Sequence, residues 1–206
     1  YKNFPFEDLS KRSKETLFGS ALAHWRLAES LNLDEGMIHV FNPSIEHHGW
    51  VSPNTIIHVV IKDIPFLMDS IKMELVRLGC TLHSVAALAG IYNQRDSKGR
   101  IKQFNVASGT QEAFVAIEVS HLAEKEERTE VQNAIRHVID DVTICVDDWE
   151  AMKASMQESI DEITNMKLGF DEEDIQETKH FLEWLLEYFT FMGARQYDTK
   201  GVGAKK

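Results

Sequence analysis

The stretch TIIHVVIKDIPFLMDS, residues 55–70, decides the fold of this chain. Its first seven residues form an apolar, β-branched run, which predicts a buried strand. Asp63 then offers a helix cap, and Pro65 suits the first turn of a helix, where a backbone N–H has no partner. An apolar stripe at helical spacing continues to Gly79. We therefore expect a strand, a tight turn and a helix whose first amides face outward.

Composition argues against two classes of partner. The chain has 206 residues, and 43% of them are hydrophobic, enough to bury a core. Its formal net charge is -11 and its pI about 5.3, whereas a general nucleic-acid binder needs a basic face to neutralise phosphate. The same acidity opposes docking to an anionic membrane. No run is long and apolar enough to span a bilayer, and no signal peptide is visible. We expect a cytoplasmic protein without nucleic-acid or membrane partners.

Strands alternate with two helices along residues 55–146. The expected elements are a strand at 55–62, a helix at 65–78, a strand at 81–92, a hairpin partner at 101–104, a strand at 114–119 and a helix at 124–146. This order is the split βαβ pattern of ferredoxin-like domains, an α+β fold whose antiparallel sheet has helices on one face. The strand at 81–92 is apolar almost throughout, so we expect it to be covered on both faces.

The usual fourth strand of such a sheet does not follow the second helix. Either residues 37–41 supply it from upstream, or the sheet is completed otherwise. Flanking helices are expected at 13–31, at 148–166 and again around 175–186, and the run from Tyr188 to Tyr197 is predicted to be a strand without its partners. Both ends look cut, which indicates a fragment of a longer protein.

Several sequence blocks occur in an order and spacing that carry a family resemblance. They are Ala23-His24-Trp25-Arg26, Val40-Phe41-Asn42-Pro43, Gly49-Trp50, Ile64-Pro65-Phe66-Leu67-Met68-Asp69-Ser70, Arg95-Asp96 with Gly99, and Phe189-Thr190-Phe191-Met192-Gly193. Over most of residues 20–198 the chain resembles the N-terminal region of the large bacterial NAD-dependent glutamate dehydrogenases. In that family this region looks like ACT-type domains, ferredoxin-like modules that bind amino acids in other enzymes.

The resemblance implies a division of the chain and a function. The expected segments are an N-terminal helical segment at 1–36, an ACT-like α+β domain at 37–146, a helical extension at 147–187, and a linker or the truncated start of another domain at 188–206. The implied function is a non-catalytic regulatory and assembly region of an enzyme that deaminates glutamate oxidatively with NAD. Its expected partners are other domains of the same chain, further subunits of a homo-oligomer and a candidate amino-acid effector. The alternative is a stand-alone amino-acid-sensing module.

The strand–helix turn is the candidate ligand site, and two interpretations of it stay open. The candidate ligand-binding residues are Asp63, Ile64, Pro65, Phe66, Leu67, Asp69 and Ser70. In the functional interpretation, the amides of Phe66 and Leu67 bind a carboxylate, and Asp63, Asp69 or Ser70 contacts an ammonium or hydroxyl group. In the structural interpretation, Asp63 caps the helix, Pro65 begins it, and Phe66 and Leu67 fill the core. Amino-acid-binding ACT domains usually place Gly after the proline, where this chain has Phe66.

Catalytic and metal-binding motifs find little support in the sequence. It has no GxSxG, no P-loop and no GxGxxG after a strand, so we expect NAD to bind the parent enzyme outside this fragment. A third hypothesis, a metal-dependent enzyme, rests on His47 and His48. Adjacent side chains diverge, and no third ligand stands at a suitable spacing. We therefore expect no metal site and no catalytic residue in the chain.

Overall fold

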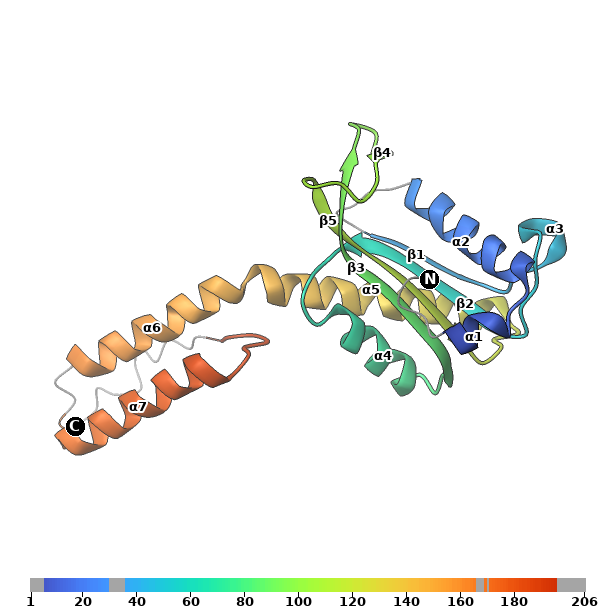
Figure 1. Ribbon diagram of the computed structural model, residues 1–206. Coiled ribbons are helices and arrows are strands. Elements are labelled where there is room, and N and C mark those ends of the chain that lie inside the picture. Colours follow the sequence, from blue (N-terminus) through green and yellow to red (C-terminus); the bar gives the residue numbers. More distant parts are fainter. Residues whose placement is uncertain (1–5, 30–35, 166–168, 170, 196–206) are drawn as a thin grey trace. The chain divides into compact units, whose positions relative to one another are not determined.

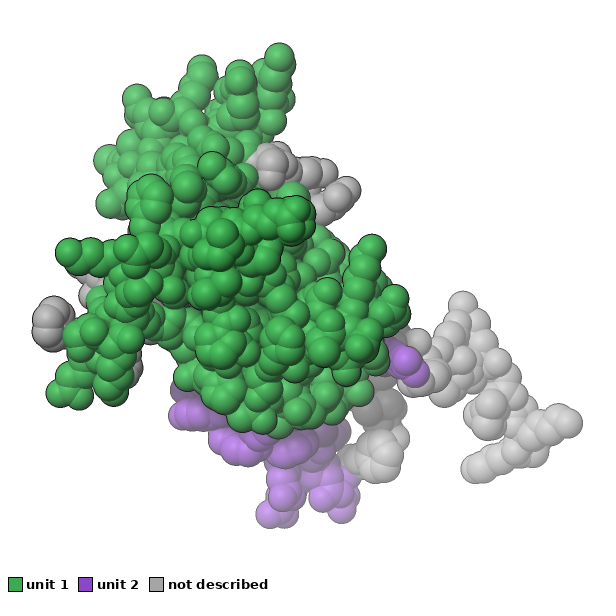
Figure 2. Space-filling view, turned by 90° about the vertical axis from the view of Figure 1, so that its right-hand side faces the viewer, with its two compact units in different colours: residues 1–142 green, residues 143–206 purple. Residues whose placement is uncertain are grey.

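The computed structural model describes residues 6–29, 36–165, 169 and 171–195 (Figure 1). The chain divides into two compact units, residues 1–142 and 143–206, which Figure 2 colours separately. The boundary falls inside the long helix α5 (Lys125–Asp147). The division into segments 1–36, 37–146, 147–187 and 188–206 stays a prediction.

Unit 1 is built on a five-stranded antiparallel sheet with the order β1-β2-β5-β3-β4. The strands are β1 (Met37–Phe41), β2 (Thr55–Lys62), β3 (Leu82–Arg95), β4 (Ile101–Gln103) and β5 (Thr110–Val119). β1 pairs with β2 at the place of the missing fourth strand, so the upstream alternative is confirmed. The sheet and its helices confirm the predicted α+β, ferredoxin-like class.

Helices α4 (Leu67–Arg77) and α5 lie on one face of the sheet (Figure 1). The core between them is almost wholly aliphatic. It contains Ile38, Val40, Ile57, Val59, Ile61, Leu67, Ile71, Leu75, Ala113, Val115, Ile117, Val119, Val131, Ile135 and Ile139. After α4, Gly79 has a φ of 78° and the N–H of Cys80 donates to the Leu75 carbonyl at 2.9 Å, so the predicted glycine stop is confirmed.

The opposite face carries the N-terminal helices α1 (Phe6–Ser10) and α2 (Lys14–Glu29), with the short α3 (Ile45–His48) nearby (Figure 1). α2 packs against β1 and β2, which explains why β2 is buried over Thr55–Ile61 although it contains Thr55 and His58. β3 is only partly buried, and its Val85, which pairs with the core residue Ile117 on the α4 side, is 40% exposed. The expectation that this strand is covered on both faces is therefore wrong.

Unit 2 contains α6 (Trp149–Asn165) and α7 (Glu172–Tyr188), which pack together. The strand expected at 188–197 is wrong where the structure describes it. Tyr188 ends α7, and residues 189–195 form neither helix nor strand, while 196 and 197 lie outside the described residues. The aromatic run packs as rings instead of pairing as a strand, because Phe189 contacts Trp184 at 5.0 Å between ring centroids.

Candidate functional site

The turn between β2 and α4 differs from the predicted helix start. α4 begins at Leu67, two residues after Pro65, and Phe66 precedes it with a φ of 65° in the left-handed region. That conformation costs a non-glycine residue about 1–2 kcal/mol. Leu67 is buried in the core as expected, but the Phe66 ring is 50% exposed, so its predicted place in the core is wrong.

Asp63 does not cap α4, contrary to the structural interpretation. Its Oδ2 accepts a hydrogen bond from the Gly90 N–H at 2.7 Å and one from Gln111 Nε2 at 3.5 Å. Gly90, with a φ of 72°, sits where the β3–β5 register shifts. The carboxylate therefore holds a bulge of β3 in place, a role that depends on a residue 27 positions away.

A small pocket of about 140 Å³ lies under this turn. Of the predicted ligand residues, Asp63, Ile64, Phe66, Leu67 and Asp69 line it. Pro65 and Ser70 lie outside its lining, and the Ser70 N–H already donates to the Phe66 carbonyl at 3.0 Å.

The rest of the pocket wall is apolar, and its carboxylates are engaged. The other lining residues are Met68, Ala87, Ala89, Ala113 and Val115. Asp63 holds the bulge, and Asp69 forms an exposed ion pair with Lys72 at 2.7 Å. What the turn offers chemically is the amino end of α4, whose dipole favours an anion.

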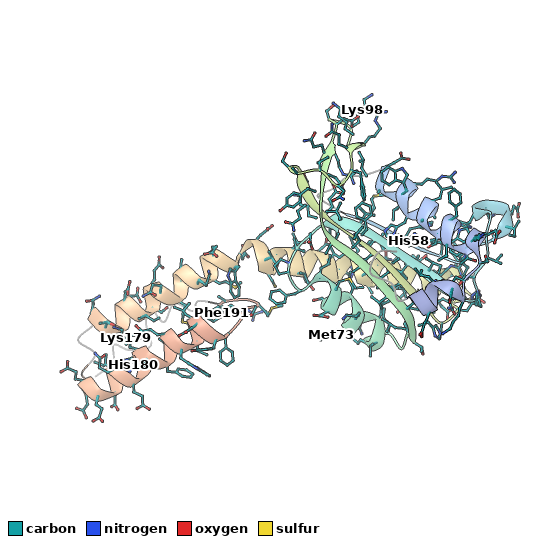
Figure 3. The ribbon with its side chains drawn as sticks, in the orientation of Figure 1. His58, Met73, Lys98, Lys179, His180 and Phe191 are labelled. Atoms are coloured by element: carbon teal, nitrogen blue, oxygen red, sulfur yellow. The ribbon has the colours of Figure 1, made fainter. Side chains whose placement is uncertain are left out.

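Two histidines meet on the α2 face, and the sequence did not predict their contact. His24 of α2 and His58 of β2 stack with ring centroids 4.2 Å apart, and Figure 3 labels His58. His24 Nε2–H donates to the Val59 carbonyl at 3.1 Å, and His58 Nε2 lies 3.4 Å from the Ser20 hydroxyl. One indication of this contact was present in the sequence: each histidine interrupts an otherwise apolar stripe, which suggests that it is buried.

Burial keeps both histidines uncharged. Burial lowers the pKa of His24 to about 4, although its hydrogen bond to the Val59 carbonyl opposes this. Burial, followed by the neighbouring His24 and His39, lowers the pKa of His58 well below its ordinary value. Among the described residues, His58 Nδ1 has no hydrogen-bond partner. The pair is a neutral ring stack at neutral pH.

A buried ion pair joins three parts of unit 1. Arg95 donates from Nε and Nη2 to the two carboxylate oxygens of Glu112, each at 2.7 Å, and both side chains are at most 5% exposed. Arg95 Nη1 donates to the carbonyls of Ala28 and Gly99, and Asn93 donates to Glu112 at 2.9 Å. The network ties the end of α2 and the β3–β4 hairpin to β5.

The adjacent histidines of the metal hypothesis serve local packing. His48 Nδ1 accepts from the Ser44 N–H at 3.1 Å, and its ring stacks on Phe41 at 4.8 Å. The rings of His47 and His48 lie at 82° to one another. No group of three or more potential metal-ligating side chains occurs in the described ranges, and no helix there is long and apolar enough to cross a membrane.

Comparison with known proteins identifies the family of this fold and turn. Residues 1–135 match the model of the family described as "Glutamate dehydrogenase, ACT1 domain". The chain belongs to this family. It is 33% identical over 198 residues to the NAD-specific glutamate dehydrogenase of Pseudomonas aeruginosa and 32% identical over 209 residues to that of Halomonas elongata. These alignments cover 93% and 97% of the chain but only 12% and 13% of the relatives.

Membership of this family confirms the resemblance drawn from the sequence blocks, and the structure explains several of them. Arg95 holds the buried network, and the Asn42 side chain accepts from the Thr55 hydroxyl at 2.7 Å and donates to the Leu122 carbonyl at 2.9 Å. Trp50 is 2% exposed and packs against Gly19, where an added Cβ would lie 2.2 Å from its ring. These blocks therefore secure the fold of the ACT1 domain.

Proposed function

We propose that this chain is a non-catalytic regulatory and assembly region of a large NAD-dependent glutamate dehydrogenase. The rest of that enzyme would deaminate L-glutamate oxidatively to 2-oxoglutarate and ammonia, using NAD, in the cytoplasm. The observation that carries the proposal is the family match over residues 1–135 in a chain that spans only 12–13% of its NAD-specific relatives. The four predicted segments remain part of this proposal.

The strand–helix turn and the sheet that the structure describes do not fit NAD. A dinucleotide needs a glycine-rich strand–helix turn in a parallel βαβ unit, so that the backbone approaches the pyrophosphate. Here the turn carries Ile64, Pro65 and Phe66, and the sheet is antiparallel. We therefore assign the cofactor of the parent enzyme to residues outside this chain.

The free edge of the sheet supports an assembly role. β3 pairs with β4 at Gln94 and Arg95, and in the described structure no strand covers its outer edge over residues 82–89. The other edge is partly occupied, because Gln132 Oε1 accepts from the Val40 N–H at 3.4 Å and Arg136 Nη1 donates to the Gly36 carbonyl at 3.1 Å. An uncovered edge strand favours pairing with another chain.

Two measurements test the assignment to a larger enzyme. An antibody against this chain should detect a polypeptide many times heavier than 23.6 kDa in the source cells. The purified chain should not reduce NAD with glutamate, whereas the full-length polypeptide should. A native band near 23.6 kDa, or NAD reduction by the purified chain, would contradict the proposal.

A charge on the free edge tests the assembly role. Val85→Lys should lower the mass of the full-length oligomer in light scattering, because Val85 is 40% exposed on this edge. Met73→Lys, on the outer side of α4 and 72% exposed (Figure 3), is the matched control and should leave the mass unchanged. If the oligomers of both variants had the same mass as the unmodified protein, assembly would use another surface.

The second candidate function is amino-acid sensing at the turn. The pocket of about 140 Å³ at the amino end of α4 supports it. Calorimetric titration of the chain with a panel of amino acids separates the two functions. Heat that is lost on Ala89→Trp, which fills this pocket, would establish a sensor, and the absence of heat at millimolar ligand would exclude one.

A further inference from the structure

A second, larger hollow lies between α2 and the β3 side of the sheet. Its volume is about 520 Å³, within the range of small-molecule pockets. Its floor is formed by two small residues, Ala86 of β3 and Ala116 of β5, which stand directly opposite each other. Its α2 wall includes the exposed Ala21. Three small side chains on facing elements leave space that larger residues fill elsewhere.

One end of this groove is aromatic. Trp25, Phe104, Phe114 and Leu88 line it. The Phe104 ring makes edge contacts with Trp25 at 5.5 Å and with Phe114 at 5.7 Å between centroids. Such rings offer both faces and edges to a flat aromatic ligand.

The other end is polar but already neutralised. Arg12 forms an ion pair with Glu118, which also accepts from Asn54 Nδ2 at 3.4 Å. Their side chains are only 24% and 18% exposed. The two ends are four residues apart along β5, from Phe114 to Glu118, a distance of about 13 Å in an antiparallel strand.

The charges of the groove select an uncharged ligand. A carboxylate or ammonium would have to break the pair between Arg12 and Glu118 or leave its own charge unpaired, and both are costly away from water. His24, which lines the groove, is neutral because burial lowers its pKa. The Ser84 hydroxyl, which also lines the groove and has no partner among the described residues, can hydrogen-bond a neutral group.

We propose that the groove bounded by Ala21, Ala86 and Ala116 binds a neutral, flat aromatic molecule with one hydrogen-bonding edge. The ring lies over Ala86 and Ala116, with one side toward Phe114 and its hydrogen-bonding edge toward Ser84. This site is on the opposite sheet face from the turn at Asp63–Ser70. The proposal stands independently of the glutamate dehydrogenase assignment, since it concerns binding by this chain alone.

Titration of the 206-residue chain with indole, followed by amide NMR shifts, tests the site. Indole should shift the signals of Ala86 and Ala116 in a saturable way. Ala21→Phe and Ala86→Phe should each weaken binding by about tenfold or more, because the added ring occupies the hollow. Ala21→Phe changes an exposed helix position, so it separates lost binding from lost folding.

Controls decide both the place and the class of ligand. Ala89→Phe adds the same ring at the turn pocket and should leave indole binding unchanged. Indole-3-acetate and tryptophan, which carry charges, should bind more weakly than indole. The proposal is overturned if indole causes no saturable shift, if Ala89→Phe weakens binding as much as Ala86→Phe, or if a charged analogue binds more tightly. It is also overturned if the Ala86 signals move only with protein concentration, which would make a second copy the occupant.

Discussion

The sheet face under α4 and α5 is packed with aliphatic side chains, whereas the face under α2 holds its helix with rings, histidines and a buried ion pair. Aliphatic contacts are non-directional and tolerate small shifts of a helix. Hydrogen bonds and ring stacks require particular positions, so Arg95 and His24 fix where α2 lies. The α4 and α5 face therefore supplies most of the buried apolar surface, whereas the α2 face fixes the position of its helix on the sheet.

Removing the arginine of the buried network should have the largest effect. Arg95→Ala leaves Glu112 charged and unpaired at 0% side-chain exposure, which should destabilise unit 1 by about 3–5 kcal/mol in urea unfolding. Arg77→Ala, which breaks an exposed pair with Glu74, is the control and should lower the stability far less, because solvent screens an exposed ion pair. Equal losses would mean that the α2 face does not depend on this network.

Acid should weaken the α2 face before the aliphatic face. The folded pKa of His24, about 4, lies below its ordinary value of 6.5, so the unfolded chain takes up the proton first. Above pH 6.5 His24 is uncharged in both the folded and the unfolded state, so it does not affect stability there. As the pH drops from 6.5 to about 4, the free energy of unfolding falls by about 3 kcal/mol in all. His58 is shifted in the same direction and adds to the loss.

Chemical unfolding at a series of pH values checks this, with His24→Gln as the test variant. Its stability should fall less steeply between pH 6.5 and 4 than that of the unmodified chain. His137→Gln, at an exposed position of α5, should keep the original slope. Parallel curves for all three proteins would show that His24 already carries its proton in the folded state.

Adding a single methyl group to α2 should also lower stability by disturbing how the helix packs. The Cβ of Gly19→Ala would lie 2.2 Å from the ring of Trp50, so helix or ring must move, at a cost of about 1–3 kcal/mol. Thermal unfolding measures this loss. Gly193→Ala, whose added Cβ meets nothing within 4 Å, should change the melting temperature little. If Gly19→Ala changed the melting temperature as little as Gly193→Ala does, α2 would be held more loosely than its contacts indicate.

The smallest expected effect is a gain in stability, from a substitution in the turn that leads into α4. Phe66→Gly relieves left-handed strain and should stabilise the chain by about 1 kcal/mol. Asn105→Gly, at the other described non-glycine residue with positive φ, should gain less, because Asn tolerates this region. A loss of stability on Phe66→Gly would show that the half-exposed ring contributes more packing than its strain removes.

The sequence predicted the aliphatic face far better than the α2 face, for a physical reason. Periodic apolar residues such as Ile71 and Leu75 indicate an element and its buried side without knowledge of a partner. Asp63 was misassigned because its partner, Gly90, comes from a bulge that no local pattern announces. The stack of His24 on His58 likewise needs the position of α2, which side-chain periodicity does not provide.

The strand–helix turn that carries the candidate ligand residues was predicted, but its backbone conformation was not. Residues 63–70 do form a strand–helix turn with a pocket, as the order of elements required. The backbone of Phe66 could not be foreseen, since proline at the preceding position suggested an immediate helix. The groove over Ala86 and Ala116 was also missed, because it exists only where α2 ends its coverage of the sheet.

The unequal edges of the sheet limit how far it can grow. Gln132 and Arg136 occupy backbone groups beside β1, while β3 offers its outer edge over residues 82–89. Two β3 edges paired about a two-fold axis would leave only the partly occupied β1 edge at each end, which disfavours the addition of further strands. Strand addition through β3 would thus favour closed pairs over fibres.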